Sequence, residues 1–210
     1  RAEAMISEDA APDARGPRAP ARFSRLWTFI VVGLALRIAL VFVPSAHTDV
    51  LTFRQWGKAA ADHGTTRVWS GGGCNYMPVY PAILCVATKA YRAATGGEGD
   101  ALPAWALKAM PVVGDLLTAL ALFLLLRRMT GEPIASAIAG VHFVNPAILI
   151  DSAGWGQVDV FHSLLVMASL AFAHWGRTRH DAWHHAAWIA FTLAILVKLQ
   201  AIVFGPLLLA

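Results

Sequence analysis

Four ionisable side chains stand beside long apolar segments of the sequence: Asp49, Asp151, Asp159 and Lys198. A carboxylate can take a proton from a reacting hydroxyl, and a lysine ammonium is a compact positive charge that binds phosphate. Ionisable groups near or within membrane-spanning segments are costly and usually functional. The residues therefore predict a polar site, if the surrounding helices bring them together.

The composition indicates that these helices lie in a membrane. Of the 210 residues, 57% are hydrophobic and only 14% are charged, and the mean hydropathy is +0.55. A transmembrane helix needs about 20 mostly apolar residues. We therefore predict an all-α, polytopic transmembrane helix bundle of five to six spans. The five segments are 26–43, 109–126, 134–150, 160–173 and 186–203, and a sixth begins near Ala201.

The two ends of the chain suggest a larger protein. Residues 1–25 are rich in alanine, proline and charge, so we expect a disordered cytoplasmic tail before a membrane domain over 26–210. The chain starts with Arg1 and stops inside an apolar run, so we expect the N-terminal part of a longer polytopic protein. A secretory signal peptide is disfavoured, because the first apolar run is long and contains Arg37.

Arginines in the short loops give the orientation. Positive charge in such loops marks the cytoplasmic side. All the clusters agree if the N-terminus is cytoplasmic and the long loop 45–108 is external. The clusters are Arg15, Arg18, Arg22 and Arg25 before the first segment, Arg127 and Arg128 after the second, and Arg177 and Arg179 after the fourth.

The external loop is expected to have its own structure. Residues 49–63 read as a helix with Phe53 and Trp56 on one face, and residues 65–75 read as glycine-rich and irregular. Residues 81–94 are apolar but short and contain Lys89, so we predict an amphipathic helix in the outer interface, with a short re-entrant helix as the alternative.

The same topology makes the turn 145–159 external and lets the fifth span run outward to Lys198 and Gln200. Asp49, the 76–81 segment, the turn and Lys198 are therefore expected near one external boundary.

Residues at this boundary resemble the GT-C superfamily of membrane glycosyltransferases, which use polyprenyl-phosphate-linked sugars as donors. The order and spacing of the pieces look most like the bacterial integral membrane mannosyltransferases, although a full GT-C core has more spans. The pieces are His47-Thr48-Asp49, the segment 76–81, Lys108 with Pro111, Asp115 and Arg127-Arg128, Asn145-Pro146, the segment 154–159, and Val197-Lys198-Leu199-Gln200.

The resemblance implies an inverting hexosyltransferase that moves mannose or another hexose to a glycan, lipid or protein acceptor. It implies that Asp49 is the base, where the alternative is a helix cap or a solvated carboxylate. It also implies that Lys198 and Gln200 bind the donor phosphate, where the alternative is a lysine that merely extends to the interface. A bacterial inner membrane with the site on its periplasmic face is the expected location.

Further residues are expected to bind substrate. Gln157 and Asp159 can hydrogen-bond a sugar, although Asp159 can also cap a helix. Trp155 can stack on a sugar or anchor in the aromatic belt at the membrane interface. No metal site is assigned, although Asp151 and Asp159 could hold a divalent ion. The expected substrate-binding residues are Tyr76, Tyr80, Trp155, Gln157, Asp159 and Asp151.

Two charges lie deeper in the apolar segments. Arg37 lies about 10 Å and Asp115 about 9 Å below the outer ends of their segments, counting 1.5 Å per residue. Equal depth on antiparallel neighbours predicts a structural ion pair.

Other classes of function are less well matched. The sequence has no phosphate-binding loop, dinucleotide motif or zinc pattern, and nothing in it requires nucleic acid. A transporter or channel fragment remains the main alternative, and a non-catalytic membrane scaffold the second. Cys74 and Cys85 are both in the external loop, and whether they pair is left open.

Overall fold

The computed structural model describes residues 24–44, 48–97, 100–176 and 182–209, and all regular structure in these ranges is helical. The all-α prediction is therefore confirmed. The helices are α1 (Ser24–Val41), α2 (Thr48–His63), α3 (Arg67–Gly72), α4 (Val79–Ala94), α5 (Ala104–Thr130), α6 (Glu132–Phe143), α7 (Pro146–Leu149), the π-helical η1 (Ile150–Trp155), α8 (Asp159–Gly176), α9 (Ala182–Val197), the 3-10 helical η2 (Leu199–Phe204) and α10 (Gly205–Leu209).

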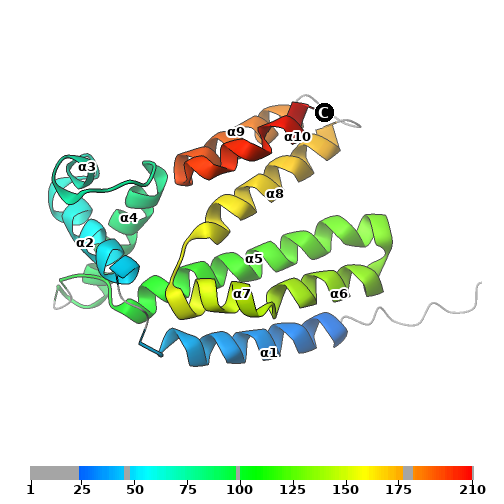
Figure 1. The fold of residues 1–210 in the computed structure, drawn as a ribbon, viewed down its shortest axis with the longest axis horizontal. Helices are drawn as coiled ribbons and strands as arrows, with labels where there is room; N and C mark the ends of the chain where they lie inside the picture. The colour runs from blue at the N-terminus through cyan, green and yellow to red at the C-terminus, as the bar shows by residue number, and fades with distance from the viewer. Residues whose placement is uncertain (1–23, 45–47, 98–99, 177–181, 210) are drawn as a thin grey trace, which may run out of the picture.

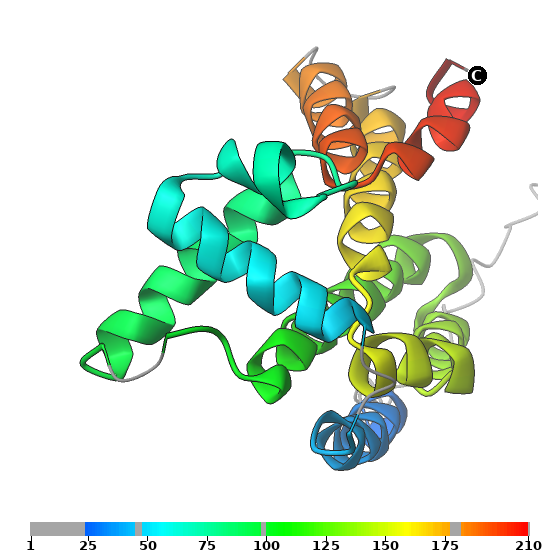
Figure 2. The same ribbon diagram turned by 60° about the vertical axis from the view of Figure 1, so that its left-hand side comes forward.

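The longer helices pack lengthwise into a bundle. α5 packs against α6 and α8, α8 against α9, and α1 against α6 (Figure 1). The three helices α2, α3 and α4 form a separate lobe, which we call the α2–α4 lobe, at the end of the bundle where α5 begins. Figure 2 shows this lobe beside the junctions that precede α8 and follow α9.

One described helix is long and apolar enough to cross a membrane. It is α5, with 27 residues, and a second span would be counted if α6 and the α7–η1 segment, bent by 45°, are one unit. The five to six separate spans expected from the sequence are thus not confirmed. α9 is apolar but only 16 residues long, because it ends at Val197 rather than continuing to residue 203.

The predicted segment 134–150 is interrupted. α6 ends at Phe143, and Pro146, which has no N–H, begins the next helix. The side chain of Asn145 caps that helix by accepting a hydrogen bond from the Ala147 amide at 2.9 Å. The prediction that residues 145–159 form a turn was therefore wrong for most of this stretch, because α7 and η1 make residues 146–155 helical.

The α2–α4 lobe has its own hydrophobic core. Phe53 and Trp56 of α2 are buried with Tyr80 and Leu84 of α4, as the single-face pattern of the first helix predicted. The helix predicted over 49–63 is present as α2, and the one over 81–94 as α4. The stretch 65–75 is not wholly irregular, since it contains α3, which is capped at its C-terminal end by Gly73 with a positive φ of 61°.

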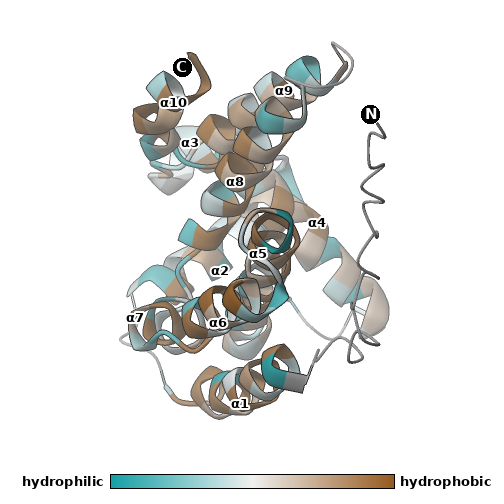
Figure 3. Ribbon diagram, turned by 90° about the vertical axis from the view of Figure 1, so that its right-hand side faces the viewer, coloured by the Kyte–Doolittle hydropathy of each residue, from teal (hydrophilic) through white to brown (hydrophobic). Residues whose placement is uncertain are grey.

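Figure 3 shows that apolar residues run along the bundle helices and that hydrophilic residues gather at helix ends and in the lobe.

Candidate functional site

Polar residues from four distant parts of the chain meet where the α2–α4 lobe adjoins the end of the bundle. Asp49 comes from the first turn of α2, and Tyr76 from the segment between α3 and α4. Gln157 precedes α8, and Lys198 separates α9 from η2. The structure thus brings together the residues that the expected topology assigned to one boundary.

Gln157 connects Asp49 to Tyr76. Its side-chain Nε2 donates a hydrogen bond to Asp49 Oδ2 at 2.6 Å. Its Oε1 accepts from the Tyr76 hydroxyl at 3.4 Å. All three residues are half-buried, so they remain accessible from one side.

Lys198 forms the other half of the site. Its Nζ pairs with Asp159 Oδ1 and lies 5.5 Å from the centre of the Tyr76 ring, within cation–π range. Lys198 can point here because its backbone is extended (φ −150°, ψ 123°) between two helices. Asp159 is the first residue of α8, the position at a helix N-terminus where negative charge is stabilised, as the alternative interpretation of this residue expected.

Tyr76 is held from behind by aromatic rings. Phe53, Trp56 and Tyr80 lie 5.6, 5.6 and 5.4 Å from its ring centre. The indole N–H of Trp69 donates to the Tyr76 carbonyl at 2.9 Å. Burial raises the pKa of Tyr76, and the charge of Lys198 only partly opposes this. The hydroxyl therefore stays protonated near neutral pH and can donate its hydrogen bond.

A pocket of about 220 Å³ opens beside these groups. Gln200 is exposed at this pocket, as expected for a residue that could contact a ligand. Met77 lies in the predicted segment 76–81 and Leu199 in the motif 197–200, although neither was assigned a contact of its own, whereas Asn75, next to Tyr76, was missed. The lining residues are Asn75, Tyr76, Met77, Lys198, Leu199 and Gln200.

Other predicted residues do not line this pocket. Tyr80 is only 1% exposed and packs behind Tyr76, so it supports the site rather than facing a ligand. Trp155 is 46% exposed on η1, and Asp151 is half-buried on the same segment. His47 lies outside the described residues, as do Arg15, Arg18, Arg22, Arg177 and Arg179 of the arginine clusters.

The chemistry of the site does not include an assembled metal centre. Within the described ranges, no three His, Cys, Asp or Glu residues are grouped as metal ligands would be. Of the two carboxylates considered for a divalent ion, Asp159 is already paired with Lys198. Cys74 and Cys85 are both free thiols.

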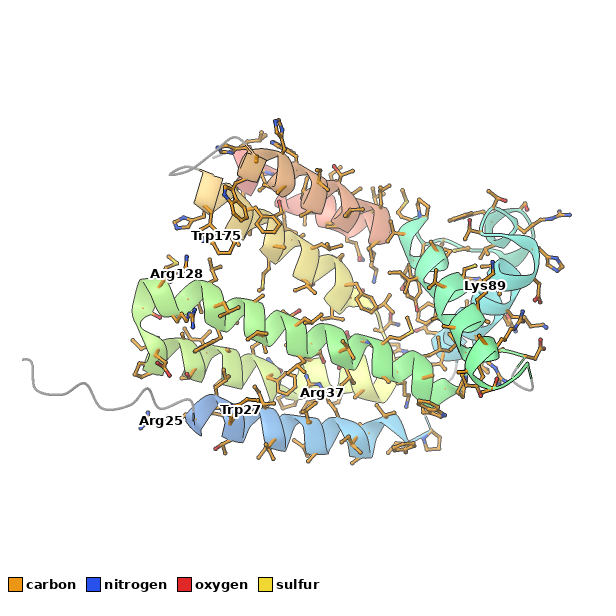
Figure 4. The ribbon with its side chains drawn as sticks, turned by 180° about the vertical axis from the view of Figure 1, so that it is seen from behind. Arg25, Trp27, Arg37, Lys89, Arg128 and Trp175 are labelled. Carbon is orange, nitrogen blue, oxygen red and sulfur yellow. The ribbon has the colours of Figure 1, made fainter. Side chains whose placement is uncertain are left out.

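Arg37 and Asp115 are in direct contact inside the bundle, as expected from their equal depth. Asp115 Oδ2 accepts from Arg37 Nε at 3.0 Å and from a terminal guanidinium nitrogen at 2.8 Å, and the side chains are 0% and 1% exposed. Arg37 also donates to the Phe143 carbonyl at 2.6 Å, and Ser152 donates to Asp115 at 2.5 Å. Figure 4 shows Arg37 at the interface of α1 with the rest of the bundle.

No protein-family model, curated protein or solved structure matches this chain.

Proposed function

We propose that the protein is a membrane glycosyltransferase of the GT-C type, which moves a hexose from a polyprenyl-phosphate donor to an acceptor hydroxyl at the external face of the membrane. The observation that carries the proposal is a half-buried carboxylate, Asp49, linked through Gln157 to Tyr76, whose ring contacts a half-buried cation, Lys198, at a pocket that Tyr76 and Lys198 line.

The two charges suit the two ends of this reaction. Asp49 would take the proton of the acceptor hydroxyl, whose oxygen bonds to the anomeric carbon. The bond from that carbon to the phosphate oxygen breaks, and polyprenyl phosphate leaves with its electron pair. Lys198 would stabilise the charge that develops on the phosphate, and Gln200 would hydrogen-bond it. Attack from the side opposite the leaving group inverts the anomeric configuration.

The pairing of Lys198 with Asp159 has a consequence for binding. An ammonium already neutralised by a carboxylate attracts a phosphate less strongly than a free one. Donor binding would therefore require Lys198 to share its charge between Asp159 and the phosphate. Because Nζ has three donor hydrogens, it can contact both.

The outer surface of the bundle supports a membrane location. Large apolar side chains are exposed on α1 at Val31 and Ile38, at 63% and 61%, and at Phe42 just after the end of this helix, at 71%. α5 is exposed in the same way at Val113 and Leu117, at 57% and 48%. Contiguous exposed apolar surface of this kind marks contact with a membrane or a partner. Five to six spans would require helices shorter than about 20 residues, such as α9 with 16, to cross the membrane as well.

The distribution of charge favours an interfacial enzyme over a transporter. A conduit needs polar groups along a path through the bundle. The deep charges Arg37 and Asp115 instead neutralise each other in a buried ion pair. The polar contacts of the candidate site lie at the end of the bundle that adjoins the α2–α4 lobe.

The test measures sugar transfer in membranes that contain the full-length protein. Donors are polyprenyl-phosphate mannose, glucose and arabinose, and the variant is Asp49→Asn. Asp100→Asn is the matched control, because Asp100 belongs to the connection between α4 and α5, is 71% exposed and forms only surface ion pairs. We expect transfer by the wild type, the same rate in Asp100→Asn, and a loss of about 10²–10⁴-fold in Asp49→Asn.

The possible outcomes separate the parts of the proposal. Transfer that survives in Asp49→Asn at equal protein abundance keeps the enzyme and removes Asp49 as the base. Absence of transfer from every donor contradicts the enzyme and makes transport the function to pursue.

A further inference from the structure

Gln157 occupies an unusual place in the site, because both ends of its side-chain amide are engaged by groups from other parts of the chain. The nitrogen faces Asp49, 108 residues away in sequence, and the oxygen faces Tyr76, 81 residues away. We propose that Gln157 is a positioning residue that fixes the orientation of the Asp49 carboxylate, and that the Tyr76 hydroxyl fixes the orientation of the Gln157 amide. This inference rests on the proposed function, since it names what aims the base.

The chemistry of the three groups allows one arrangement of the amide. An ionised carboxylate can only accept hydrogen bonds, so it requires the NH₂ end of the amide. The opposite arrangement would set the amide oxygen against a carboxylate oxygen. A protonated tyrosine hydroxyl can donate to the remaining oxygen, and burial keeps Tyr76 protonated.

The backbone that carries Gln157 is also constrained. Gly156 has a positive φ of 86°, which only glycine adopts without strain, and it ends the π-helical segment η1. A Cβ atom at Gly156 would lie 3.0 Å from the side chain of Val50 and 3.2 Å from that of Lys108. The backbone N–H of Gln157 donates to the backbone carbonyl of Asp151 at 2.9 Å, and the next residue, Val158, is buried. The backbone position from which the Gln157 side chain extends is therefore well defined.

These contacts change the role expected for Gln157 from its sequence. A glutamine that binds a sugar would present its side-chain amide to the pocket. Here both ends are engaged by protein groups, and Gln157 is not among the residues that line the pocket. Its effect on the reaction would therefore pass through Asp49, because a base acts only when its oxygen points at the proton to be removed.

Tyr76 extends the arrangement to the other side of the site. Its ring lies under the Lys198 ammonium, while its hydroxyl bonds Gln157. Tyr76 thus contacts the cation with its ring and is connected to the base through Gln157. A shift of about 1 Å in the position of a reacting group can cost about 10²-fold in rate.

The experiment compares Gln157→Leu, Gln157→Glu and Tyr76→Phe with the wild type in the full-length protein. Gln55→Glu is the matched control, because Gln55 is exposed on α2, the helix that carries Asp49. The readouts are kcat, KM for the donor, and the pH at which transfer falls on the acidic side. We expect kcat to fall about 10–100-fold in Gln157→Leu, with KM changed much less, and to fall less in Tyr76→Phe.

The pH dependence separates positioning from a merely structural role. In Gln157→Glu, a second carboxylate beside Asp49 disfavours its ionised form, so the acidic limb moves to higher pH by about one unit or more. In Gln55→Glu, the limb stays where it is in the wild type. A Gln157→Glu limb unchanged from the wild type, or a loss in Gln157→Leu that appears in KM alone, would overturn the inference.

A second measurement does not need turnover. The carboxyl band of Asp49 is assigned in the infrared spectrum by its loss in Asp49→Asn, and its titration is followed in the wild type and in Gln157→Glu. A shift of that titration to higher pH in Gln157→Glu supports the contact, and an unshifted one contradicts it. A titration that shifts in Gln157→Glu, together with a wild type that transfers no sugar, counts against the proposed function alone.

Discussion

At the scale of single residues, the buried pair of Arg37 and Asp115 takes part in several hydrogen bonds that a substitution would break. Arg37 satisfies three acceptors, namely Asp115, the Gly33 carbonyl and the Phe143 carbonyl, and its guanidinium lies 4.0 Å from the centre of the Phe143 ring. Removing one partner leaves a buried charge without compensation, which typically costs about 3–5 kcal/mol.

We therefore expect Asp115→Ala alone to destabilise the protein more than the double variant Arg37→Ala, Asp115→Ala. The measurement is the unfolding midpoint of the purified protein in detergent, by intrinsic fluorescence, in a full double-mutant cycle. Arg54→Ala, at an exposed position of α2, is the control and should unfold like the wild type. Losses that simply add would contradict an energetic coupling between the two charges.

Counting residues was enough to predict this pair but not its surroundings. Equal depth on antiparallel segments pointed to Arg37 and Asp115. The bonds to Ser152 and to the Phe143 carbonyl depend on the interruption after α6, and an apolar pattern does not reveal where a backbone carbonyl is released. In the same way, the predicted topology placed Asp49, Tyr76, Gln157 and Lys198 near one boundary. The contacts among them depend on the directions of their side chains, which residue spacing does not predict.

At the scale of elements, the close packing of α1 and α6 depends on small residues. A Cβ atom at Gly140 of α6 would lie 2.2 Å from the ring of Phe29 on α1, and one at Gly33 of α1 would lie 2.6 Å from the ring of Phe143. An aromatic ring from the facing helix thus packs directly against each glycine. Small residues at such contacts let two helices approach closely.

Gly140→Val is accordingly expected to lower stability by about 1–3 kcal/mol, because the added side chain pushes against Phe29 in a packed interface. Gly71→Val is the matched control, since nothing lies within 4 Å of a Cβ at that position of α3. Thermal unfolding in detergent compares the two variants. Equal midpoints would show that α1 moves away from α6 at little cost.

The helices themselves were predictable, but several of their ends were not. The apolar runs and the pattern of Phe53 and Trp56 indicated α1, α2, α4 and α5. The extended Lys198 that separates α9 from η2 interrupts a run that hydropathy treats as continuous. The short α3 was missed because three consecutive glycines, residues 71–73, favour an irregular chain.

At the scale of the whole molecule, the charged groups divide between the two ends of the bundle. Arg25 and Arg128 lie at one end and Lys89, in the α2–α4 lobe, at the other (Figure 4). A membrane that contains the bundle would therefore separate the lobe from the arginines, with the arginines on the cytoplasmic side.

Cysteine labelling tests this arrangement. In a background with Cys74→Ala and Cys85→Ala, a membrane-impermeant maleimide should label Asp100→Cys in intact spheroplasts and Arg128→Cys only after the membrane is opened. Both positions are exposed, so a lack of labelling reports the membrane rather than burial. Labelling of both positions in intact spheroplasts would contradict the topology.

The contact between Arg37 and Asp115 also has a meaning for how the chain is made. The two residues are 78 positions apart, so α1 leaves the ribosome well before the carboxylate that neutralises its arginine. Until α5 arrives, Arg37 on α1 has no buried counter-ion and favours a wet or interfacial environment. Arg37 can therefore be buried with its partner only after α5 has been made, so the final packing of α1 depends on α5.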